Sequence, residues 1–176
     1  MYCMVICTDP VNSFEARTLE AMAARQFGMQ FAGFLNKHRD QLSIERSKNT
    51  GKIRYVYLDG TLVLVLRPEE GFFSLSLAGA AIVNELETER PINGIMVPDD
   101  VAEFIKDGKN VFAKHVLDPW PGIRPAQELY VCDEKRNVVA VGKAILSGKD
   151  MKFFKRGMAI KIRHGINDGT SETNDP

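Results

Sequence analysis

The sequence predicts an α+β fold, with helices and an antiparallel sheet in a first module and a small, closed or half-closed mixed β-barrel in a second. Two observations carry this prediction. Residues 13–38 place apolar side chains at helical spacing, and residues 42–77 then alternate apolar and polar side chains between turn signals. From residue 94 onward, a short apolar strand is followed by one helix and then by further strands. The 176 residues are enough for two small domains.

The helices of the first module have recognisable ends. Asn12 and Glu15 form a partial capping box ahead of a helix expected at residues 13–26, and Gly28 can end this helix. A second helix is expected at residues 29–38. The apolar stripe of the first helix is predicted to consist of Phe14, Leu19, Met22 and Ala23.

An antiparallel meander is predicted after these helices. Its strongest turn signal is Asp59-Gly60, because both residues tolerate positive φ. The alternation in the third strand predicts that leucines 62, 64 and 66 face inward and valines 63 and 65 the other side. A helix at residues 78–87 is expected to cover the sheet. The four strands are predicted at residues 42–48, 52–58, 61–67 and 72–77.

The second module begins with a strand at residues 94–97 and a helix capped by Asp99 or Asp100. Gly108 follows the last apolar residue of this helix, where a left-handed residue commonly ends a helix. Turns are expected at residues 134–137 and 147–150. The remaining strands are predicted at residues 110–116, 128–133, 138–146 and 158–163.

Charge is unevenly distributed along a chain whose net charge is zero. Residues 1–92 hold ten Lys and Arg against eleven Asp and Glu, whereas residues 93–168 hold thirteen against ten. Within residues 143–163 there are seven basic residues and one acid, Asp150. Such a local basic stripe is typical of a phosphate-binding face. A solvated sheet edge protected by lysines is the alternative explanation.

Metal binding, membrane insertion and autonomous catalysis have no support in the sequence. The three cysteines are an odd number and scattered, so we expect no disulfide framework, a reducing cytoplasm, and Cys3 and Cys7 as packing residues without zinc. His115 and His164 lack partners at the spacing of a catalytic motif, and no phosphate-binding glycine loop is present. The sequence contains no run of about 18 apolar residues, so no membrane span is predicted. We therefore expect no cofactor and no metal.

The second module resembles the PUA domain, an RNA-binding pseudo-barrel. The resemblance lies in four segments in the expected order: the Val97-Pro98-Asp99-Asp100-Val101 helix entry, residues 111–114, residues 139–144 and residues 155–160. It implies a PUA-like mixed β pseudo-barrel, and RNA as the partner. In PUA domains the first helix, the following strand and a late strand form the groove that holds the end of an RNA helix.

Aligning the chain to the PUA pattern implies a set of RNA-binding residues. Basic side chains in the groove would neutralise phosphates. Gly108 would let the backbone approach RNA, although ending the helix explains it equally well. Trp120 would stack on an unpaired base or, between two prolines, fill the rim of the barrel. The predicted RNA-binding residues are Lys114, His115, Arg124, Lys143, Lys149, Gly108, Trp120 and Lys152.

The first module resembles the domain that precedes PUA in archaeal tRNA-guanine transglycosylases. The resemblance lies in Arg25-Gln26-Phe27-Gly28, Ile44-Glu45-Arg46-Ser47, residues 50–54, Asp59-Gly60 and Gly71-Phe72-Phe73. Together the modules resemble the C-terminal part of the archaeosine-forming enzyme. That family also has a catalytic barrel of about 250 residues, for which this chain is too short.

The predicted function is therefore non-catalytic RNA binding in RNA modification, with tRNA or a structured RNA helix end as the favoured target. The first alternative is the C-terminal subunit of a split transglycosylase, active only with a separate catalytic protein partner. The second is a ribosome-associated or protein-interaction factor. The predicted domains are residues 1–92 for the first module and 93–168 for the PUA domain, with a disordered tail at residues 169–176.

Overall fold

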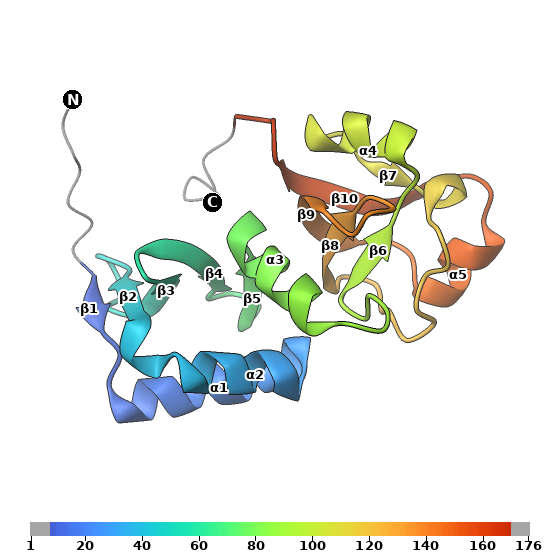
Figure 1. Ribbon diagram of the computed structural model, residues 1–176. Coiled ribbons are helices and arrows are strands. Elements are labelled where there is room, and N and C mark those ends of the chain that lie inside the picture. The colour runs from blue at the N-terminus through green and yellow to red at the C-terminus, as the bar shows by residue number, and fades with distance from the viewer. Residues whose placement is uncertain (1–7, 170–176) are drawn as a thin grey trace. The chain divides into compact units, whose positions relative to one another are not determined.

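The computed structural model describes residues 8–169 and confirms the α+β fold class (Figure 1). The chain divides into two compact units, one ending at Ser74 and the other beginning at Leu75. The predicted tail lies outside the described residues from residue 170 onward. The sequence predicted the boundary after residue 92 instead. Whether the segment after residue 92 folds by itself stays a prediction.

In the described part of the first unit, helices α1 and α2 accompany a five-stranded sheet in the order β1-β2-β3-β4-β5. The pairs from β1 to β4 are antiparallel, as the meander prediction requires. Asp59 and Gly60 have positive φ and join β3 to β4 as predicted. The helices are α1 (Ser13–Phe27), α2 (Met29–Lys37) and a 3-10 turn (Arg39–Gln41), and the strands are β1 (Asp9–Pro10), β2 (Leu42–Arg46), β3 (Ile53–Leu58), β4 (Thr61–Arg67) and β5 (Phe72–Leu75).

The capping box of α1 is confirmed, but its predicted apolar stripe is partly wrong. Asn12 Oδ1 accepts from the backbone N–H groups of Phe14 and Glu15, and a Glu15 carboxylate oxygen accepts from the Asn12 N–H. Phe14 is 78% exposed, because the buried face repeats every four residues from position 15 and Phe14 lies off that face. That face consists of Glu15, Leu19, Ala23 and Phe27.

Strand β4 is covered on both faces, which its predicted alternation of leucines and valines did not specify. Val63, Leu64 and Val65 are all buried, so side chains on both faces of this strand are covered. Val65 packs with Tyr55, Tyr57 and the half-buried Leu62 in a separate cluster. Side chains pointing opposite ways along a strand can all be buried only where both faces of the sheet carry packed atoms.

The second unit is a curled mixed sheet in the order β6-β8-β9-β10-β7. β6 runs parallel to β8, and the other pairs are antiparallel. The backbone N–H of Leu117 donates to the carbonyl of Met96 at 2.8 Å, which brings the segment after β7 back to β6. The elements are α3 (Leu77–Leu86), β6 (Gly94–Met96), α4 (Asp99–Lys106), β7 (Val111–Phe112), a 3-10 turn η2 (Ala113–His115), β8 (Glu128–Cys132), β9 (Val138–Ala144), α5 (Gly148–Phe153) and β10 (Met158–Gly165).

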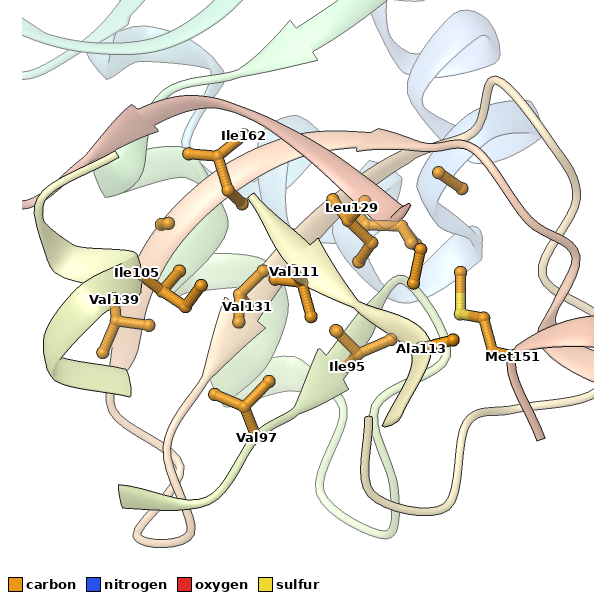
Figure 2. Packing of buried hydrophobic residues seen from close by; sticks show 14 of the residues in the cluster. Ile95, Val97, Ile105, Val111, Ala113, Leu129, Val131, Val139, Met151 and Ile162 are labelled. Carbon is orange, nitrogen blue, oxygen red and sulfur yellow. The ribbon is translucent and has the colours of Figure 1, made fainter. Parts of the chain in front are cut away.

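The interior of this curled sheet is apolar. Figure 2 shows Ile95, Val111 and Val131 pointing toward one another from different strands, with Ile105 of α4 beside them. All four side chains are at most 2% exposed. This core fixes the positions of α4 and of the segments that leave the sheet.

Three local predictions for the second unit are wrong. The predicted turn at residues 147–150 is the start of helix α5, where Ser147 Oγ accepts from the Asp150 N–H as an N-cap. The strand predicted at residues 110–116 is only β7, because the chain turns into η2. Asp99 and Asp100 lie in the first turn of α4 rather than at its cap, which is Pro98.

Helix α3 belongs to the second unit, whereas the sequence placed it in the first module. Its Ala80 and Val83 are buried, and it packs against β8 and β9. Glu87, just after the helix, is 8% exposed, and its carboxylate accepts from the Tyr130 hydroxyl at 2.8 Å and from the Asn93 N–H. These contacts tie the residues preceding the barrel to strand β8.

Arg136 and Glu128 extend this polar packing on either side. Arg136 donates to the side-chain oxygen of Asn84 at 2.9 Å and to the carbonyl of Glu87 at 2.6 Å. The Glu128 carboxylate pairs with Arg163 at 2.6 Å and accepts from the Leu75 N–H. We call the side chains of Asn84, Glu87, Asn93, Glu128, Tyr130, Arg136 and Arg163 the buried polar network.

Candidate nucleic-acid interface

A groove of about 670 Å³ lies between η2 with its following loop and helix α5. Apolar side chains of Ala113, Val116 and Met151 line it, and Ala113 and Met151 are buried. We call this the α5 groove. Its polar lining is mostly cationic, with one carboxylate: Lys114, Lys152, Lys155 and Asp118. Pro119 and Phe154 complete the lining.

Local packing fixes the two sides of the α5 groove. The backbone N–H of Ala113 donates to the carbonyl of Gly157 at 3.0 Å, which holds η2 against the segment leading into β10. Gly148, the first residue of α5, donates its N–H to the carbonyl of Ile123. A Cβ atom at Gly148 would lie 1.9 Å from the carbonyl oxygen of Trp120, so only glycine permits this approach.

The charged groups of the α5 groove are exposed and weakly paired. The Asp118 carboxylate lies 3.5 Å from the Arg90 guanidinium and 4.0 Å from the Lys152 ammonium, and its side chain is 80% exposed. Exposed pairs at such distances contribute little to stability, typically about 0–1 kcal/mol. The lysines of the groove therefore keep charge with which they can bind an anionic partner.

Of the predicted RNA-binding residues, Lys114 and Lys152 come together on opposite sides of the α5 groove. His115 is half-buried in η2, and Lys149 is exposed on α5. Trp120 is half-buried, packs against the barrel core, and lies where a Cβ on Gly122 would meet its ring at 2.4 Å. Its predicted role in base stacking stays a prediction.

The other three predicted residues lie on other elements. Gly108 follows α4 and has φ +80. A Cβ atom added at Gly108 would contact the Asp168 side chain, and the Gly108 backbone lies close to Gly165 at the end of β10. Helix α5 precedes the start of β10, and the eight residues of this strand span roughly 25 Å. Gly108 therefore lies by the end of β10 that is far from α5. Lys143 lies in β9 opposite Glu128 of β8, and Arg124 is exposed in the turn before β8.

Phe154 and Asp118 line the α5 groove, and the sequence prediction did not include them. A signal for Phe154 was present, because the aromatic pair Phe153-Phe154 stands between Lys152 and Lys155. Interleaved aromatic and basic residues are common in single-strand binding sites. Asp118 carries no comparable signal, since its position depends on how the loop after η2 returns to α5.

Within residues 8–169, no helix combines the length and apolar character needed to cross a membrane. No three His, Cys, Asp or Glu side chains in that range gather as metal ligands. Cys3 and Cys7, predicted to be packing residues, lie outside the described part of the chain, whereas Cys132 is buried in β8.

Comparison with known families agrees with this architecture. Residues 93–166 match the PUA domain, and residues 17–89 match the patch-forming domain C2 of tRNA-guanine transglycosylase.

Two solved structures share the fold over almost their whole length. A hypothetical protein of Pyrococcus horikoshii has a TM-score of 0.72 and 20% identity, covering 92% of this chain and 96% of its own. A conserved PUA domain protein of Thermoplasma acidophilum has a TM-score of 0.66 and 21% identity, covering 90% and 93%. The chain thus contains a PUA domain at residues 93–166.

Curated relatives make the family more specific. The tRNA-guanine(15) transglycosylase of Pyrococcus abyssi is 36% identical over 160 residues, which are 91% of this chain and 26% of the relative. That of Methanobrevibacter smithii is 35% identical over 152 residues, 86% and 23% of the two chains. The chain resembles the C-terminal region of these archaeal enzymes, and it spans about a quarter of the length of the curated relatives it matches.

Proposed function

We propose that this protein is a non-catalytic RNA-binding protein whose target is tRNA or another structured RNA. The observation that carries the proposal is the α5 groove, where Lys114, Lys152 and Lys155 surround an apolar lining within the PUA domain. Lysines bind nucleic acid mainly through phosphates, which makes binding depend on salt and little on sequence. The relation to tRNA-guanine(15) transglycosylases supports tRNA as the class of RNA.

Fluorescence anisotropy with labelled RNA hairpins over a salt series tests this proposal. The logarithm of the binding constant is expected to fall with the logarithm of salt concentration by roughly 0.7–0.9 for each phosphate neutralised. Replacing Lys114 or Lys152 by Ala is expected to reduce the slope by about one unit and to weaken all hairpins alike. Lys135→Ala is the matched control, because Lys135 is an exposed lysine in the turn between β8 and β9.

The proposal fails if no hairpin shows salt-dependent binding, or if the groove variants bind like Lys135→Ala. The other predicted contacts enter the same assay. Arg124, Lys143 and Lys149 are proposed as additional phosphate contacts, and each Ala variant is expected to reduce the slope if RNA reaches beyond the groove. Variants that leave the slope unchanged would confine the interface to the α5 groove.

A second candidate function follows from the partial coverage of the relatives. A chain equivalent to the C-terminal quarter of a transglycosylase has the chemistry of an accessory subunit for a separate catalytic chain. In that case the protein alone would incorporate no labelled guanine into tRNA, but would raise the tRNA affinity of a catalytic barrel chain mixed with it. Incorporation by the protein alone would exclude both the accessory and the non-catalytic proposals.

A further inference from the structure

The α5 groove has two chemically different parts, and RNA phosphates can use only one of them. The lysine ammonium groups attract phosphate, whereas Ala113, Val116 and Met151 offer apolar surface. A paired RNA helix presents phosphates and sugars on its outside and keeps its base faces stacked within. An unpaired base, by contrast, has an apolar face that can cover these three side chains.

Phe154 supplies a surface for such a base. Its ring lines the groove and is 52% exposed, and it lies beside lysines 152 and 155. Aromatic side chains in basic grooves stack on bases of any sequence, because every base has a π-face. The neighbouring Phe153 is 80% exposed and does not line the groove. Replacing Phe153 therefore serves as a control that distinguishes stacking in the groove from a general effect of removing an exposed ring.

Asp118 adds a feature that phosphate binding does not explain. Its carboxylate repels phosphate, yet it lines a groove that otherwise carries lysines. Its backbone has φ +37, which is uncommon for a residue other than glycine. Arg90 and Lys152 lie at 3.5 and 4.0 Å from the carboxylate, which orients it while its 80% exposure leaves acceptor positions open to a ligand.

A carboxylate only accepts hydrogen bonds, so it distinguishes bases by their donors. Cytosine, adenine and guanine each carry an exocyclic amino group, at N4, N6 and N2, whereas uracil has carbonyl oxygens in its place and only a single ring N–H donor between them. Resting on the proposed function, we propose that the α5 groove binds one unpaired nucleotide with an exocyclic amino group. Phe154 stacks on its base, Asp118 accepts from its amino group, and Lys114 and Lys155 neutralise the flanking phosphates.

Hairpins with one common stem and a four-nucleotide 3′ tail test this inference on the full chain. The tails consist of cytidines, adenosines, uridines or abasic residues, so the phosphate number stays constant. Wild type is expected to bind cytidine and adenosine tails about tenfold more tightly than uridine tails, the size expected for one good base contact. Abasic tails are expected to bind most weakly.

Two variants assign the contacts to residues. Phe154→Ala is expected to lose about tenfold on every tail that carries bases and nothing on the abasic tail. Phe153→Ala is expected to bind like wild type on all tails. The amide of Asp118→Asn can either accept from cytosine or donate to a uracil carbonyl, so the ratio of cytidine to uridine affinity is expected to fall to about one. The ratio is the readout because loss of the charge alone raises affinity for all tails equally.

The possible outcomes separate this inference from the proposed function. Salt-dependent binding that is equal for all tails, or equal losses in Phe154→Ala and Phe153→Ala, would overturn the inference and leave RNA binding intact. A cytidine-to-uridine ratio that Asp118→Asn leaves unchanged would also overturn the assignment of Asp118. The absence of salt-dependent binding to any hairpin, tailed or blunt, would overturn both.

Discussion

The buried polar network and the α5 groove use the same kinds of charged residue for opposite purposes. In the network, the Glu128 carboxylate is 2% exposed and lies 2.6 Å from Arg163, and it also accepts a backbone N–H. In the groove, the Asp118 carboxylate is 80% exposed and lies 3.5 Å from Arg90. Removing one partner of a buried, hydrogen-bonded pair strongly destabilises the fold, because the other charge stays buried and uncompensated. Charges that are exposed and loosely paired remain available for a ligand.

Truncation is expected to give the largest effect, because it removes one side of the network. A chain of residues 93–176 lacks Asn84 and Glu87, so Tyr130 and Arg136 lose partners, and it also lacks the buried Val83. We expect it to be less stable than a chain of residues 75–176 by on the order of 5 kcal/mol. Urea denaturation followed by the fluorescence of Trp120, the single tryptophan, measures the difference.

The truncation also tests the predicted domain boundary. If residues 93–176 unfold at the same urea concentration as residues 75–176, the boundary after residue 92 separates independent folding units. Helix α3 would then contribute nothing measurable to the stability of the barrel.

Removing one carboxylate from each region compares them directly. Glu128→Ala is expected to cost about 3–5 kcal/mol, since it leaves the Arg163 guanidinium without its buried acid. Asp118→Asn, which also removes an acid paired with an arginine but keeps a side chain that tolerates the positive φ of this residue, is expected to change stability by less than about 0.5 kcal/mol. Urea denaturation of both variants is the measurement. Equal losses would show that exposure does not separate the two kinds of pair.

Glu15 in the first unit is an intermediate case. Burial of the carboxyl acts to raise its pKa, but the hydrogen bonds from Arg46 and from the Asn12 backbone outweigh burial, so the pKa lies below its ordinary value. A lowered folded-state pKa contributes stability above the unfolded pKa, and this stability is lost as pH falls through the folded pKa. Glu15→Gln is expected to cost about 1 kcal/mol at pH 7.

This difference is expected to disappear on acidification, since wild type and Glu15→Gln converge once Glu15 is protonated. Far-UV circular dichroism during urea denaturation at pH 7, 5, 4 and 3 measures the convergence. Asp133 in the second unit also has a lowered pKa, because hydrogen bonds from the Asn137 side chain and from backbone N–H groups outweigh its burial. Trp120 fluorescence follows that unit separately, and its pH dependence is expected to be the same in Glu15→Gln. A difference that persists at pH 3 would contradict the assignment to Glu15.

Much of the fold was predictable because local patterns and local energetics agree. The α1 capping box and the Asp59-Gly60 turn each depend on contacts within four residues, and both are confirmed. Helix α5 was missed although Ser147 and Asp150 carry a capping signal, because six residues give too short a periodic pattern. The exposure of Phe14 could not be predicted from the sequence. Which of two adjacent helix residues is buried depends on which side of the helix packs against the rest of the unit.

The sequence by itself determined the two modules, their order, the basic stretch and the relation to PUA domains and tRNA-guanine transglycosylases. All of these are patterns along the chain. Only the tertiary structure decided that α3 packs with the barrel, that Lys114 lies across a groove from Lys152, and that Asp118 lies beside Arg90. Those relations join residues 28 to 52 positions apart, and they depend on how the curled sheet and its loops return upon themselves. Spacing along a sequence does not encode which distant side chains share a surface, and burial then decides whether a charge stabilises the fold or binds a ligand.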